Sequence, residues 1–312
     1  MPLSTSVRGA VAGAVLLAAA VTVARPVRFA LAAPAPVAPA LDATTALRAA
    51  VGDVLDDSLL GRSGKLRARF VAADDADRLA RAIGLARDFA RRGAEVPKAA
   101  DLAVVPLLPF TAKIDGRVGP YVLGTWPHER RRRARPDGDA PLPVGFIQVT
   151  PDNDDLPISA HFRLGDFLTK NQVDVWPKML VLREPLIDKL ELVIDELRAS
   201  GVHVAHLQVM SGFRTPAYNA LGVGRGGRAQ DSRHQYGDAA DVFVDNDHDG
   251  RMDDLDGDGR ITVRDADVIV RAAERVEARV PALVGGIGRY RATAAHGPFV
   301  HIDVRGRRAR WG

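Results

Sequence analysis

Two histidines and one aspartate in this sequence have the types and spacing of ligands for a metal ion. SRHQYGDAADV at 232–242 places His234 and Asp241 seven residues apart, with small residues between them. A catalytic zinc takes three protein ligands and keeps one position for water. The third ligand must come from elsewhere, and His301 in HGPFVHIDVRG is placed for it. The alternative, for each residue taken alone, is a hydrogen-bonded His–Asp pair at the surface.

An acidic run follows at 245–265 and has the spacing of ligands for calcium. DNDHDGRMDDLDGDGRITVRD contains two overlapping copies of D-x-D-x-D-G-x5-D, an EF-hand loop pattern with aspartate in place of the closing glutamate. We expect two kinds of calcium ligand in this run. One is the main-chain carbonyl of Arg260, and the others are the side-chain oxygens of Asp245, Asp247, Asp249, Asp254, Asp256, Asp258, Thr262 and Asp265. The alternative is a solvated acidic loop, but clustered carboxylates without a cation repel one another.

The composition excludes several classes of function. The chain has no cysteine, which excludes disulfides, thiolate metal sites and a cysteine nucleophile. Its formal charge of +4, from 43 basic and 39 acidic residues, is mild, and much of the excess lies in PHERRRRARP at 127–136. We therefore expect no nucleic-acid partner.

The N-terminal segment predicts export. Arg8 precedes an apolar run from Ala10 to Ala24, which is shorter than the ~20 residues of a membrane span and suits a signal peptide. We expect residues 1–32 to be a signal peptide, with an uncleaved membrane anchor as the alternative, and 33–42 to be a Pro/Ala-rich tether. The protein would then act in the periplasm or cell envelope, and would contact a membrane only through that anchor. The sequence sets no oligomeric state.

The remaining chain predicts an α+β fold in two parts. Residues 43–150 have a helical pattern over 43–97, followed by short strands and turns that include GFIQVT, which indicates a small α+β module of unassigned role. A second domain is expected over 157–312. It contains a helix in LREPLIDKLELVIDELRASG, with Pro185 near its start and Gly201 past its end, and then a strand in VHVAHLQVM.

Four segments of the second domain resemble one enzyme family. In order, SGFRTPAYNA, SRHQYGDAADV, GGIGRY and FVHIDV resemble the zinc D-alanyl-D-alanine peptidases and murein endopeptidases of the LAS group, named for lysostaphin, D-Ala-D-Ala peptidases and sonic hedgehog. The likeness covers 157–312 and implies a small antiparallel sheet with flanking helices. It implies that His234, Asp241 and His301 bind zinc and that Arg214 binds the substrate's carboxylate or polarises its carbonyl. The acidic run resembles the tandem calcium repeats of the thrombospondin and dockerin types.

The general base departs from the family pattern. Relatives often carry Glu or His two or three residues before the last ligand, whereas this chain has Phe299 and Pro298 there. His296 and Asp303 are the candidates for the base, and the alternative role of Asp303 is to orient the ligand His301.

The expected function is therefore that of an exported zinc metallopeptidase. The resemblance implies a hydrolase that cleaves amide bonds in peptidoglycan stem peptides or cross-links, as a D,D-carboxypeptidase or an endopeptidase. One alternative is an envelope-binding module that keeps the peptidase fold without hydrolysis. Another is a calcium-dependent interaction protein that uses the acidic run.

Overall fold

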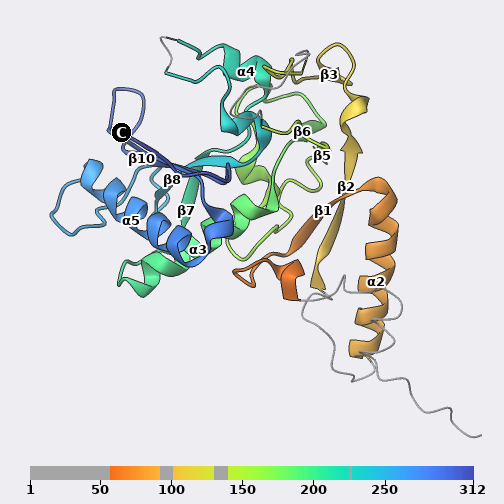
Figure 1. The fold of residues 1–312 in the computed structure, drawn as a ribbon, viewed down its shortest axis with the longest axis horizontal. Coiled ribbons are helices and arrows are strands. Elements are labelled where there is room, and N and C mark those ends of the chain that lie inside the picture. Colours follow the sequence, from red (N-terminus) through yellow and green to blue (C-terminus); the bar gives the residue numbers. More distant parts are fainter. Residues whose placement is uncertain (1–56, 92–100, 130–139, 225–226) are drawn as a thin grey trace, which may run out of the picture. The chain divides into compact units, whose positions relative to one another are not determined.

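The computed structural model describes residues 57–91, 101–129, 140–224 and 227–312, which form a mixed α+β fold as the sequence predicts (Figure 1). The helices are α2 (Ala73–Arg91), α3 (Glu184–Ala199), α4 (Pro216–Ala220) and α5 (Val263–Arg279). Short 3-10 turns are η2 (Asp57–Leu60), η4 (Phe110–Ala112), η5 (Leu164–Phe167), η6 (Arg233–Tyr236) and η7 (Pro281–Leu283). The predicted signal segment, the tether and the arginine run at 130–136 lie outside the described residues.

One sheet has four strands in the order β1-β2-β5-β6. They are β1 (Ala68–Ala72), β2 (Ala103–Pro109), β5 (Gly145–Val149) and β6 (Lys178–Leu180). β1 and β2 are parallel, so they need a crossover connection, and α2 lies within it and packs against both strands. The other two pairs are antiparallel. A separate hairpin consists of β3 (Arg117–Val118) and β4 (Tyr121–Val122).

Strand β1 corrects the prediction that 43–97 is helical. Its sequence, ARFVA, contains an aromatic and a β-branched residue, which favour a pleated, half-buried surface. Phe70 lies opposite Val105 of β2, and the helix begins only at Ala73. From there the predicted helical face is correct, because Leu79 and Ile83 are buried.

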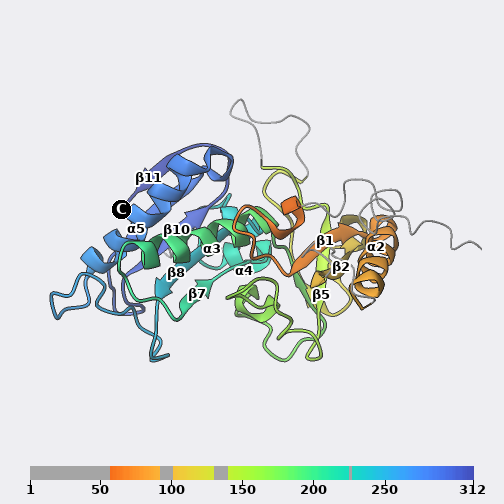
Figure 2. The same ribbon diagram turned by 90° about the horizontal axis from the view of Figure 1, so that it is seen from below.

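The second sheet has five strands in the order β11-β9-β10-β8-β7. They are β7 (Leu207–Ser211), β8 (Ala239–Val244), β9 (Gly286–Tyr290), β10 (Phe299–Asp303) and β11 (Ala309–Trp311). β11 is parallel to β9, and the other pairs are antiparallel. α5 packs against β9 and β10, and α3 packs against α5 (Figure 2). The sheet therefore places β10 between β8 and β9.

The predicted helix α3 is fully buried along its apolar face, including Leu186, Leu190 and Leu197. Pro185 lies in the first turn of this helix, where a backbone N–H would have no partner within the helix, so the missing N–H of proline costs no hydrogen bond. One hydrophobic core joins this helix and its sheet to Trp126 and Phe146 of the preceding segment. The described residues on both sides of residue 150 therefore share one core.

Candidate metal centre

The three predicted metal ligands lie together. His301 of β10 is directly opposite Asp241 of β8, and His234 reaches them from the turn η6. His301 Nδ1 is 2.9 Å from Asp241 Oδ1 and 3.1 Å from His234 Nε2, which is itself 3.2 Å from Asp241 Oδ1. All three residues are at most 6% exposed. They form a buried group that could bind a metal ion.

The turn before β8 sets the position of His234. It ends at Gly237, whose φ of +67° is costly for other residues. A Cβ at this position would lie 2.3 Å from the carbonyl oxygen of Val181, so the close approach also requires glycine. Trp126 donates its indole N–H to the Gln235 carbonyl at 2.8 Å. Trp126, which precedes β5 in the chain, therefore stabilises the turn that carries His234.

Each ligand is fixed by a second polar contact. His234 Nδ1 lies 2.7 Å from the Gly212 carbonyl, so this nitrogen donates and Nε2 keeps its lone pair for a metal. His301 Nε2 lies 3.1 Å from Asp303 Oδ2, which leaves Nδ1 for the metal. Asp241 accepts a bond from Arg214 on Oδ2 and faces the histidines with Oδ1. Such outer contacts orient metal ligands and fix the tautomers of the histidines.

Burial and charge determine the protonation of this group without a metal. Burial lowers the pKa of His234. At His301 burial acts in the same direction, but hydrogen bonds to Asp241 and Asp303 raise its pKa overall. Burial opposes ionisation of Asp241, yet the charges and hydrogen bonds of the two histidines hold its pKa well below its usual range. A cation bound here would therefore displace a proton from His301.

Asp303 contacts the nitrogen of His301 that faces away from Asp241 and His234. It is fully buried behind His301, where it bonds to His301 Nε2 and to Arg305. Its Oδ1 also accepts the Gly286 N–H at 2.7 Å. Hydrogen bonds from these partners hold its pKa far below its usual range in spite of burial. These contacts favour the alternative role of Asp303, which is to orient His301, over that of a general base.

A cavity of about 600 Å³ opens beside the three ligands. Arg214 and His296 both line it. Arg214 is held by Asp241 and by Ser211, whose Oγ is 2.9 Å from Nε, and its Nη1 has no acceptor among the described residues. His296 is half-buried and places Nδ1 2.8 Å from the Gly297 carbonyl. The structure therefore brings both residues to the cavity that contains the metal ligands.

Trp311 is a cavity residue to which the sequence analysis gave no role. Its ring centroid lies 5.2 Å from that of His301, and its indole N–H donates to Tyr290 Oη at 2.8 Å. A Cβ at Gly288 would lie 2.3 Å from the indole nitrogen, so this glycine makes room for the ring. Two sequence segments could have indicated its place: GGIGRY, which contains β9, and the closing RRARWG, which contains β11, the strand that pairs with β9.

The acidic run forms two separate groups of carboxylates. The first joins Asp245 and Asp247 to Asp253, and the second joins Asp254, Asp256 and Asp265. The sequence pattern places Asp256 at the end of the first loop, whereas in the structure Asp253 is the residue that lies with Asp245 and Asp247. Asp253 was missed because the pattern was extended by the full EF-hand length.

The other predicted calcium ligands have different contacts. Asp258 Oδ2 accepts from Arg264 at 3.0 Å, and Asp249 Oδ1 accepts the N–H of Arg251 at 2.8 Å. The Thr262 hydroxyl accepts the Arg264 N–H at 3.1 Å and so caps α5. The carboxylates of Asp249 and Asp258 do not belong to either group of three.

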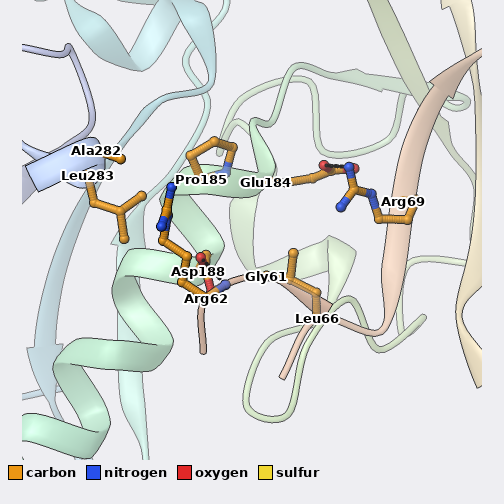
Figure 3. A pocket seen from close by; sticks show the side chains of 9 residues that line it. All are labelled: Gly61, Arg62, Leu66, Arg69, Glu184, Pro185, Asp188, Ala282 and Leu283. Carbon is orange, nitrogen blue, oxygen red and sulfur yellow. Dashed lines mark hydrogen bonds and ion pairs between the residues drawn. The ribbon is translucent and has the colours of Figure 1, made fainter. Parts of the chain in front are cut away.

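A further cavity, of about 550 Å³, lies between the segment before β1 and the start of α3 (Figure 3). Its two carboxylates are already bonded. Glu184 pairs with Arg69 at 2.9 Å, and Asp188 accepts the backbone N–H groups of Arg62 and Ser63, each at 2.8 Å. These contacts fasten the N-terminal segment to α3 and leave no acid free for chemistry.

Comparisons with known proteins add no family to these observations. No protein-family model matches the chain, and neither a curated protein nor a solved structure matches it. Within the part of the chain that the structure describes, no helix combines the length and apolarity needed to cross a membrane.

Proposed function

We propose that this chain is an exported zinc peptidase that hydrolyses amide bonds in peptidoglycan peptides. The observation that carries the proposal is the group formed by His234, Asp241 and His301 at the wall of an open cavity. Two imidazole nitrogens and one carboxylate oxygen are a frequent ligand set of catalytic zinc, which keeps a further position for water. The donor atoms are 2.9–3.2 Å apart, close to the spacing of about 3.3 Å between tetrahedral ligands that lie ~2.0 Å from zinc.

Zinc at this group would supply a water of lowered pKa and a Lewis acid for the amide carbonyl. Arg214 would assist in polarising the amide carbonyl, since it lines the same cavity and its Nη1 has no acceptor among the described residues. Its guanidinium would bind the carbonyl oxygen as negative charge develops, or a carboxylate of the substrate.

His296 is the proposed general base. Its Nδ1 contacts a carbonyl and therefore donates, so Nε2 is left as the proton acceptor. Phe299, at one of the positions where relatives carry the base, stacks on Tyr290 with ring centroids 4.4 Å apart. Phe299 and Tyr290 both line the cavity. Aromatic side chains therefore form part of the wall there, and proton transfer falls to His296.

We propose calcium as the cation of the two acidic groups. In each loop the first aspartate, Asp245 or Asp254, accepts the N–H of the glycine five residues later, at 3.1 Å and 2.7 Å. This wraps the backbone around a point toward which several carboxylates converge, and oxygen-only sites of this kind suit hard cations. Calcium binding of modest affinity suits the exported location predicted by residues 1–32, because extracellular calcium modules bind with Kd of about 10⁻⁴–10⁻³ M.

The test is digestion of purified peptidoglycan by the zinc-loaded protein, with mass analysis of the released fragments. New amino and carboxyl ends are expected, and the fragment masses identify the bond cleaved. His296→Asn should retain zinc and lower kcat at least 100-fold, whereas His234→Ala should lose zinc as well. If the zinc-loaded wild type sediments with peptidoglycan but releases no fragment, the protein is a binding module and the peptidase proposal is wrong.

A further inference from the structure

A second cavity, of about 340 Å³, adjoins the one at the metal centre. Met210 and His296 line both of them, so the two spaces meet at the proposed general base. The far wall of the second cavity comes from the first acidic loop, through Arg251 and Met252. Met252 is 1% exposed and anchors this part of the loop in the core.

Two basic side chains line this second cavity. Lys170 and Arg251 both line it, and no aspartate or glutamate of the described part of the chain does. Both side chains are exposed, and neither has a carboxylate partner among the described residues. Phe243 is one of the apolar side chains that line the rest of the cavity. A cavity with several apolar side chains and two basic side chains that have no carboxylate partner among the described residues suits a ligand that carries a carboxylate on a short aliphatic chain.

Backbone hydrogen bonds hold the turn from which Arg251 projects. The N–H of Arg251 donates to Asp249 Oδ1 at 2.8 Å, within a turn that Gly250 tightens by donating to Asp245. Lys170 comes from the segment after η5, far away in the sequence. Two independent parts of the chain therefore bring positive charge to one cavity beside the metal centre.

We propose that this cavity is a substrate subsite in which Lys170 and Arg251 bind a carboxylate of the peptide chain. The inference rests on the proposed peptidase function, because it takes the peptide to lie across the metal ligands. A peptide that passes His296 enters the second cavity, so the enzyme selects substrates that continue beyond the cleaved bond and carry an acidic group there. The carboxylate neutralises two cations that have no carboxylate partner among the described residues.

The test uses synthetic peptides that contain the bond cleaved in peptidoglycan and carry either Glu or Gln at successive positions on each side of it. At one position the wild type should prefer Glu over Gln by about tenfold in kcat/KM, because each exposed ion pair changes binding several-fold. The double variant Lys170→Gln, Arg251→Gln should bring this ratio close to one. The double variant Arg271→Gln, Arg307→Gln likewise removes two positive charges, at exposed positions that line neither cavity, and as the control for net charge it should keep the full preference.

The outcomes separate the subsite from the peptidase activity. If peptides are cleaved but the double variant keeps the preference for Glu, or the wild type has none, the subsite is wrong and the peptidase proposal stands. If no peptide is cleaved, fluorescence anisotropy with labelled Glu and Gln peptides decides the subsite. Tighter binding of the Glu peptide that is lost in the double variant supports it, and equal binding overturns it.

Discussion

Asp303 provides the sharpest test of how the metal ligands are held. The change Asp303→Asn keeps the shape of the side chain and one oxygen for the Gly286 N–H, 2.7 Å away. It removes the negative charge that faces His301 Nε2 at 3.1 Å. His301 then loses its preference for the tautomer that presents Nδ1 to the metal.

The size of the effect follows from the burial of this contact. Asp303 is fully buried, so no water can replace the lost carboxylate on His301. Loss of such an outer contact weakens metal binding by about 10–100-fold, or roughly 1.4–2.7 kcal/mol. Activity should fall at low zinc and recover in part when zinc is raised, because the variant affects occupancy more than the chemical step.

Zinc affinity is measured by competition with a chromogenic chelator, and folding by thermal melting. Glu196→Gln is the matched control, since it also converts a buried carboxylate bonded by arginine into an amide, but on α3 and away from the metal ligands. The control should destabilise the protein without changing zinc affinity. If Asp303→Asn is folded and binds zinc within twofold of the wild type, then Asp303 does not orient His301.

Three further changes have expected results. Arg214→Ala should lower kcat by about 10²–10³-fold and weaken zinc by no more than about tenfold through Asp241; a loss of zinc as complete as in His234→Ala would make the arginine structural. Calcium at ten times its Kd should raise the melting temperature by roughly 3 °C for each site. The double change Asp256→Ala, Asp258→Ala should remove the part of this rise that comes from the second loop. An equal melting temperature in calcium and in a calcium chelator too weak to remove zinc would refute calcium binding. The hydrogen bond from Arg275, helped by Arg279, lowers the pKa of Glu196 below 4.5, so ionised Glu196 stabilises the fold above pH 4.5, and this stabilisation is lost as pH falls through the folded-state pKa. The melting temperature of Glu196→Gln should be about 2–4 °C below that of the wild type at pH 7, and the difference should disappear in acid. A difference that does not change with pH would contradict this.

The sequence predicted the metal group because its signals are local. His301 and Asp303 alternate along a strand, and His234 and Asp241 flank a turn that requires glycine. Spacing and residue type suggested His234 and Asp241, and the family resemblance joined His301 to them. The directions of the side chains did not follow from spacing. Asp303 shares the strand period of His301, yet it contacts Nε2, the nitrogen of His301 that faces away from Asp241 and His234.

Long-range pairing explains what the sequence did not predict. β1 is a strand because it finds a partner in β2, more than thirty residues later in the chain, and local helical patterning gave no sign of this. In the same way, β6 completes a sheet begun before residue 150. In each case tertiary contacts outweighed a local pattern.

The position of the acidic run between the second and third metal ligands has a physical consequence. Asp265 bonds through Oδ1 to the N–H of Leu255, at 2.8 Å, and through Oδ2 to that of Thr262, at 2.6 Å. It thus holds the second loop and caps α5 at the same time. Because α5 packs on β9 and β10, its first turn is tied to the strand that carries His301. A cation that orders the loop would therefore stabilise the register that brings His301 opposite Asp241, and the two kinds of metal site would support one another through a single helix.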